Sequence, residues 1–163
     1  MSFSDQRKDR TPWQPLIVGW SDYSPFWQDV SNFNVIPGTG GYCIGRYSMI
    51  AAFTMAIRIN ILWGSAAGNG GNGAHHFSLP PGYVSGVGTQ LLTTETGQIG
   101  SGNGVGFGYV AGGQTGIRPF GYASAGSATL VQWGTAGAGV GPTGWYPNGN
   151  GTVQGTLEVA QQW

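Results

Sequence analysis

The 163-residue chain has little charge, since only 7% of its residues are Asp, Glu, Lys or Arg, against about 25% in an average soluble domain. Beyond residue 30 the charged residues are Arg46, Arg58, Glu95, Arg118 and Glu158. No cluster of Lys or Arg can neutralise several phosphates, so we expect no nucleic-acid partner. A body with so little charge must rely on uncharged polar residues for solubility or cover its surface with partners, which favours assembly.

The chain also has little cysteine and no long apolar segment. Cys43 is the only cysteine, which excludes an internal disulfide and fits folding in a reducing cytoplasm; we interpret it as a small buried apolar residue. The first ten residues mix acids with bases and have no apolar core, unlike a secretory signal. The apolar run from Met49 to Trp63 is too short to span a bilayer and contains Arg58 and Asn60, so we expect no membrane association.

No glycine-free and proline-free segment carries a helical apolar stripe, because 32 glycines and 9 prolines are spread through the sequence. The sequence therefore predicts an all-β fold. Its clearest strand runs to Trp63, because large apolar residues alternate with Thr54, Ala56, Arg58, Asn60 and Leu62. This period of two predicts that one face carries Phe53, Met55, Ile57, Ile59, Ile61 and Trp63. The Gly- and Asn-rich residues 64–73 that follow are typical of a loop.

Several shorter segments have strand character and are separated by Gly-rich turns. They are residues 42–49, 75–79, 90–94, 105–110, 116–122, 128–133 and 152–160. In the last, Val153, Leu157 and Val159 are predicted to face one side, and Thr152, Gln154, Thr156 and Glu158 the other. Short strands at this spacing favour a β-sandwich or jelly-roll, which we place at residues 31–163.

Residues 1–30 are predicted to form an extended N-terminal arm. Residues 11–28, TPWQPLIVGWSDYSPFWQ, contain prolines and aromatics but little regular alternation. We expect the arm to anchor the protein through its aromatic residues, Trp13, Trp20, Tyr23, Phe26 and Trp27. Trp145 and Tyr146, late in the body, are candidate contacts for a receptor or an interface. Ordinary packing in the core or between subunits is the alternative for all of these side chains.

The residues for catalysis and cofactor binding are scarce. Glu95 and Glu158 are the only carboxylates beyond the arm, and solvated strand positions explain them better than a glycosidase pair does. GNGGNG at residues 68–73 matches a dinucleotide-binding fingerprint by letter, but no helix follows it. His75 and His76 are adjacent and point to opposite faces of a strand, so they cannot share one metal ion within a subunit. We expect no enzyme activity and no cofactor; a metal site built from one histidine at a threefold axis stays open.

Four stretches in order resemble a small β-domain of tailed bacteriophages. They are WSDYSPFWQ at residues 20–28, GRYSMI at residues 45–50, the alternating strand that ends at Gly64, and HFSLPPGY at residues 76–83. The domain recurs in actinobacteriophage minor tail proteins and in fibre or capsid decoration proteins. The resemblance covers about residues 20–163, and its motifs, concentrated before residue 85, are packing and turn motifs rather than chemistry.

This resemblance implies a non-enzymatic virion component, made in the bacterial cytoplasm and displayed on the outside of the phage particle as a homotrimer. Its partners would be capsid or tail proteins. No collagen-like repeat or coiled-coil shaft precedes the domain here, so a capsid decoration or a tail-proximal knob is favoured over a long fibre. The alternative is a tail module in which Gly-rich loops and exposed aromatics bind a glycan or another receptor on the host surface.

Overall fold

The computed structural model describes residues 19–29, 34–64, 74–99, 102–122, 130–132 and 149–162. These residues contain strands and turns but no helix, which confirms the all-β class. The strands are β1 Ser21–Tyr23, β2 Trp27–Asp29, β3 Tyr42–Ala51, β4 Thr54–Leu62, β5 His75–Ser78, β6 Tyr83–Ser85, β7 Gln90–Ile99, β8 Gly102–Val110, β9 Gly116–Tyr122, β10 Leu130–Gln132 and β11 Asn150–Gln161. No helix capable of crossing a bilayer occurs within the described ranges.

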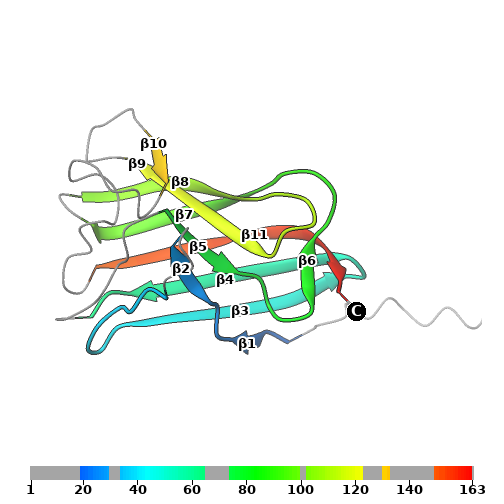
Figure 1. Cartoon of the computed structure of the whole chain (residues 1–163), viewed down its shortest axis with the longest axis horizontal. Helices are drawn as coiled ribbons and strands as arrows, with labels where there is room; N and C mark the ends of the chain where they lie inside the picture. Colours follow the sequence, from blue (N-terminus) through cyan, green and yellow to red (C-terminus); the bar gives the residue numbers. More distant parts are fainter. Residues whose placement is uncertain are drawn as a thin grey trace, which may run out of the picture.

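The strands form one curled antiparallel sheet in the order β1-β3-β4-β11-β7-β8-β9-β5-β2 (Figure 1). β10 extends it beside β9, and β6 pairs with the end of β11. Because β1 and β2 are adjacent in sequence but stand at opposite ends of this order, the sheet must curl until its ends approach. In Figure 1, β5 and β9 run obliquely in front of the longer strands. The arrangement agrees with the predicted β-sandwich or jelly-roll class.

The core fills the concave side of the curled sheet. One continuous cluster of buried residues includes Ile59 of β4, Val153 of β11, Phe77 of β5 and Ile117 of β9. Since β4 and β11 belong to one half of the sheet and β5 and β9 to the other, the two halves face each other across this cluster. Complete burial of such a side chain contributes about 1.5–3 kcal/mol to stability.

The alternation predicted for β4 is confirmed, with one correction. Met55, Ile57, Ile59 and Ile61 are buried, and so is Trp63, which directly follows the strand. Phe53, however, is 68% exposed. Ala51 pairs with Thr54, so Ala52 and Phe53 form the turn between β3 and β4 and the period of two does not extend to them. The alternation of Val153, Leu157 and Val159 in β11 is confirmed as well, since all three are buried.

Several other strands extend beyond their predicted boundaries, whereas β5 ends at Ser78, one residue before the predicted end. β3 and β7 continue to Ala51 and Ile99, and β8 begins at Gly102. β6, of three residues, was not predicted; it pairs Tyr83–Ser85 with residues 159–161 of β11. Three residues are too few to show an alternation, and only the pairing with β11 makes this segment a strand.

Residues 21–23 and 27–29, assigned from sequence to the arm, lie in the sheet. β1 pairs with β3, from Ser21 opposite Tyr47 to Tyr23 opposite Gly45, and β2 pairs with β5. The hydroxyl of Tyr23 donates to the carbonyl of Ser78 at 3.1 Å, and the backbone N–H of Phe26 donates to the Ser78 hydroxyl at 2.9 Å. These bonds join the two ends of the sheet, so this part of the chain belongs to the folded body.

Candidate functional site

The residues proposed as anchors occupy different environments. Trp27 is buried in the core, where its ring lies 5.3 Å from that of Phe77 and 5.9 Å from that of Trp63 between centroids. Tyr23 is half-buried against Tyr47 at 5.9 Å. Trp20 and Phe26 are exposed. Core packing, the alternative considered from sequence, therefore explains Trp27. Trp13, Trp145 and Tyr146 lie outside the described residues, as do residues 68–73.

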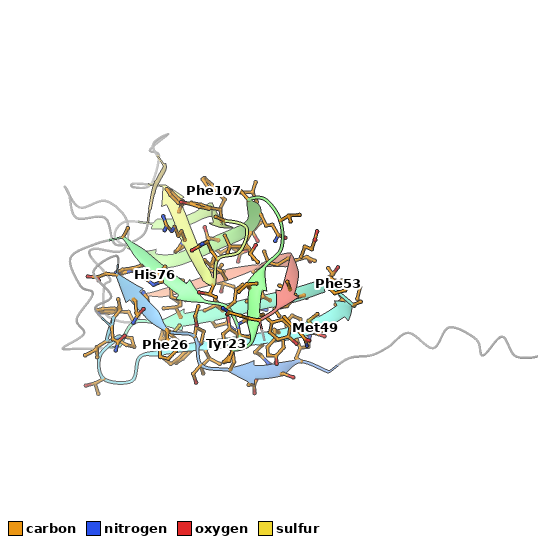
Figure 2. The ribbon with its side chains drawn as sticks, turned by 45° about the vertical axis from the view of Figure 1, so that its right-hand side comes forward. Tyr23, Phe26, Met49, Phe53, His76 and Phe107 are labelled. Carbon is orange, nitrogen blue, oxygen red and sulfur yellow. The ribbon has the colours of Figure 1, made fainter. Side chains whose placement is uncertain are left out.

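An exposed apolar end lies where residues 1–18 join the body. We use this name for Trp20, Ile50 and Phe53, which are 48%, 57% and 68% exposed. Trp20 immediately precedes Ser21, which pairs with Tyr47, so Trp20 lies beside the final residues of β3. Ile50 is one of those residues, and Phe53 lies in the turn that follows them. Figure 2 shows Phe53 at this turn, at the right of the molecule.

His75 and His76 lie on opposite faces of β5, as the alternation predicts. His75 is fully buried, and its ring packs edge-on against Trp27 with the centroids 5.5 Å apart. His76 is half-buried on the convex side. Within the described ranges, no group of three or more His, Cys, Asp or Glu is placed to hold a metal ion.

Glu95 and Glu158 are both exposed, as expected for solvated strand positions. Glu95 of β7 lies opposite Thr152 of β11, and Glu158 comes six residues further along β11. At about 3.4 Å per residue the backbone positions of the two residues lie roughly 20 Å apart along the strands. Glycosidase pairs require about 5–9.5 Å.

A recess of about 400 Å³ lies on the convex side of the sheet, over β5, β8 and β9. It is lined by His76, Tyr109, Ala111, Gly112, Gln114, Thr115, Gly116 and Arg118. The strand register explains why these side chains meet. Tyr109 of β8 lies opposite Arg118 of β9. Phe77 lies opposite Ile117 in the antiparallel β5–β9 pair. His76, one residue earlier in β5, therefore lies beside Arg118, one residue later in β9; His76 is labelled in Figure 2.

The turn between β8 and β9 forms one wall of the recess and is held by backbone hydrogen bonds. The N–H of Gln114 donates to the carbonyl of Ala111 at 3.0 Å, and the carbonyl of Gln114 accepts from Ser85 at 2.9 Å. The carbonyl of Thr115 accepts from Leu79 at 2.7 Å. Gly113 has φ of 73°, a conformation that glycine adopts without steric cost. The wall is therefore fixed before any ligand arrives.

The electrostatics of the recess are dominated by Arg118. Its Nη1 lies 3.5 Å from the hydroxyl of Tyr109, at the outer limit of a hydrogen bond. Burial lowers the pKa of His76 below its usual 6.5, and the nearby Arg118 lowers it further, while Asp29 opposes both effects. His76 is therefore neutral at pH 7, and its ring offers one donor and one acceptor.

A row of aromatic rings continues from the recess across the convex side. Phe107 and Phe120 stack with their centroids 5.1 Å apart and their planes at 4°. Tyr109, which lines the recess, lies 5.7 Å from Phe120. Phe107 lies at the upper edge of the molecule in Figure 2. The combination of flat rings with imidazole, guanidinium, amide and hydroxyl groups suits a ligand that has both apolar faces and hydroxyls, as a sugar has.

A second hollow of about 230 Å³ lies over β3, β4 and β11. Tyr42, Ile44, Asn60, Asn150 and Thr152 contribute to its lining. The hydroxyl of Thr152 donates to Oδ1 of Asn60 at 3.3 Å, and Nε of Arg58 donates to the same oxygen at 3.1 Å. These bonds already engage that oxygen, so the hollow has less hydrogen-bonding capacity left for a ligand than the recess.

Comparisons with known proteins found no match: no protein family, curated protein or solved structure is significantly similar to this chain.

Sequence reasoning identified His76 but not its neighbours in the recess. Tyr109, Gln114, Thr115 and Arg118 belong to two strands and the turn between them, and His76 to a third strand far from them in sequence. The one usable signal was Arg118, because it is one of few charged residues in the body and lies in a segment predicted to be a strand. Its pairing with Tyr109 required the register of β8 and β9.

Proposed function

We propose that this chain is a non-enzymatic structural protein of a tailed-bacteriophage virion. In this proposal it is displayed on the particle as a homotrimeric decoration or tail-proximal knob, and it docks through residues 1–18 together with the exposed apolar end. The resemblance of residues 20–28, 45–50 and 76–83 to phage modules supports the setting. The roughly 20 Å between Glu95 and Glu158 supports the non-enzymatic part.

The observation that carries the docking proposal is the position of the exposed apolar end. Trp20, Ile50 and Phe53 leave large side chains in solvent where residues 1–18 join the body. Large aromatic and aliphatic side chains left in solvent at one place mark interaction surfaces more often than scattered ones do. Because the arm and the exposed apolar end are adjacent, both can contact the same partner and both contribute to its affinity.

Incorporation into particles tests this proposal. We expect deletion of residues 2–18 to leave a folded body, because strand pairing begins at Ser21, and to abolish binding to particles that lack the protein. Phe53→Ser should lower occupancy without unfolding. Ile36→Ser is the matched control, since Ile36 is 54% exposed and lies beyond the opposite end of β4, roughly 30 Å away. Wild-type occupancy of the deletion protein would contradict docking through the arm.

The trimeric state is tested separately by light scattering. A mass about three times the 17.0 kDa of one chain is expected at micromolar concentration. The mass of a single chain, both in solution and after release from particles, would rule the trimer out.

A second candidate function is recognition of a glycan on the host surface, and the recess of Tyr109 and Arg118 is the observation that favours it. A fixed wall, exposed polar groups and a neighbouring row of rings are the elements of a saccharide site. Binding of the multivalent protein to intact host cells, reduced by Tyr109→Ala, is the expected result. Cell binding that Tyr109→Ala leaves unchanged would place any receptor contact elsewhere.

A further inference from the structure

We propose that the recess over β5, β8 and β9 binds a saccharide that carries a carboxylate, with the guanidinium of Arg118 as the partner of that carboxylate. This inference rests on the second candidate function and adds the chemical class of the ligand. It makes Arg118 the residue that determines specificity and makes the remaining lining residues contacts for the sugar ring.

Arg118 has no carboxylate partner among the described residues. Of the described acidic residues, none lines the recess and none lies within ion-pair distance of Arg118. Its hydrogen bond to the Tyr109 hydroxyl, at 3.5 Å, leaves most of its donors available. Arg46, by contrast, binds Asp22 at 2.7 Å. A guanidinium presents parallel N–H groups that match the two oxygens of one carboxylate.

The surrounding groups suit the rest of a sugar. The neutral imidazole of His76 can both donate to and accept from hydroxyls, and Gln114 and Thr115 are exposed on the fixed turn. Gly116 leaves space over His76, because a Cβ there would already lie 3.5 Å from the imidazole. The volume of about 400 Å³ lies within the usual range of small-ligand sites, about 300–1,000 Å³.

A single cation favours a carboxylate sugar over a phosphate polymer. The described cationic side chains are Arg46, Arg58 and Arg118, and of these only Arg118 lines the recess. A polyphosphate chain would need several cations along its path. One carboxylate needs one guanidinium, and the adjoining rings of Tyr109, Phe107 and Phe120 supply apolar surface for neighbouring sugar units.

The full chain, titrated by NMR with trigalacturonate and with neutral galactotriose, tests the inference. We expect trigalacturonate to bind at least tenfold more tightly, and Arg118→Gln to remove that preference. Arg58→Gln is the matched control, because Arg58 is also exposed but lies four strands from β9, roughly 19 Å along the sheet. The bound carboxylate should also raise the pKa of His76, since it offsets the field of Arg118.

The remaining outcomes separate this inference from the function on which it rests. Equal binding of both trisaccharides, unaffected by Arg118→Gln but lost in Tyr109→Ala, would keep saccharide recognition and overturn the role of Arg118. If acetate bound as tightly as trigalacturonate, the recess would be a simple anion site, and the proposal that it binds a saccharide would be wrong. No binding of either trisaccharide at millimolar concentration, with the variants folded, would overturn both proposals.

Discussion

Replacement of Gly45 by alanine should destabilise the protein, because the ring of Tyr23 lies directly on this glycine. A Cβ on Gly45 would overlap the Cε1 and Cζ atoms of Tyr23. The backbone of Gly45 itself is ordinary β-strand and accepts alanine without strain. The ring cannot yield by a small rotation, because its hydroxyl is bonded to the carbonyl of Ser78 and it packs edge-to-face with the ring of Tyr47. The methyl group would therefore push β1 away from β3.

The expected loss of stability follows from the contacts that this movement of β1 breaks. Overpacking of a tight contact costs about 1–3 kcal/mol, and loss of the bond between Tyr23 and Ser78 costs about 0.5–1.5 kcal/mol. We expect Gly45→Ala to lower the free energy of unfolding by about 2–4 kcal/mol, which corresponds to a Tm lower by roughly 5–15 °C for a domain of this size. In a strand without such an overlap, alanine is favoured over glycine by about 0.5–1 kcal/mol.

Denaturant titrations of a double-mutant cycle measure this coupling. In a Tyr23→Ala background the same Gly45→Ala change should be neutral or stabilising, because the ring is gone. Gly108→Ala serves as the control, since its Cβ would meet Ile117 at an ordinary 3.4 Å. If Gly45→Ala alone stays within about 0.5 kcal/mol of the wild type, Tyr23 does not pack on Gly45 and residues 21–23 are not part of the body.

Three further predictions concern the core, the thiol and the imidazole. Ile59→Ala should destabilise by about 2–5 kcal/mol in denaturant titrations, because Ile59 is fully buried, whereas Phe53→Ala in the exposed turn should change stability by less than about 0.5 kcal/mol. Cys43 should react with a thiol reagent at pH 8 at least about a hundredfold more slowly than in denaturant, because burial raises its pKa to about 12; equal rates would show that the thiol is accessible. His76 has a lowered pKa in the folded protein, so stability should fall as the pH drops below about 6.5, where the unfolded chain takes up the proton more readily. His76→Gln should remove that part of the pH dependence, and an unchanged slope would contradict the assignment.

The elements with long alternation could be predicted from sequence. β4 and β11 have nine and twelve residues, long enough for a period of two to separate core from solvent residue by residue. The alternation does not hold at Phe53, which is exposed. Phe53 precedes Met55 by two residues, so the alternation assigns both to the same face. The chain reverses between Ala51 and Thr54, however, and alternation does not indicate where a strand begins.

The short strands and the recess could not be predicted, because both depend on pairing between distant segments. β1 and β2 have three residues each, and their proline-containing neighbourhood resembled an arm. They are strands because β3 and β5 provide edges for them. The recess likewise exists because β9 pairs with β8 on one side and with β5 on the other, which brings Arg118 between Tyr109 and His76.

The position of β11 has a consequence for how the protein is made. This strand lies between β4 and β7 in the middle of the sheet, yet it leaves the ribosome after both of them. Until residues 150–161 emerge, β4 and β7 each present an open edge to the crowded interior of the cell, where such edges invite association between nascent chains. The sheet therefore cannot be completed before residues 150–161 have left the ribosome, and a chaperone that shields those two edges would raise the yield of native protein.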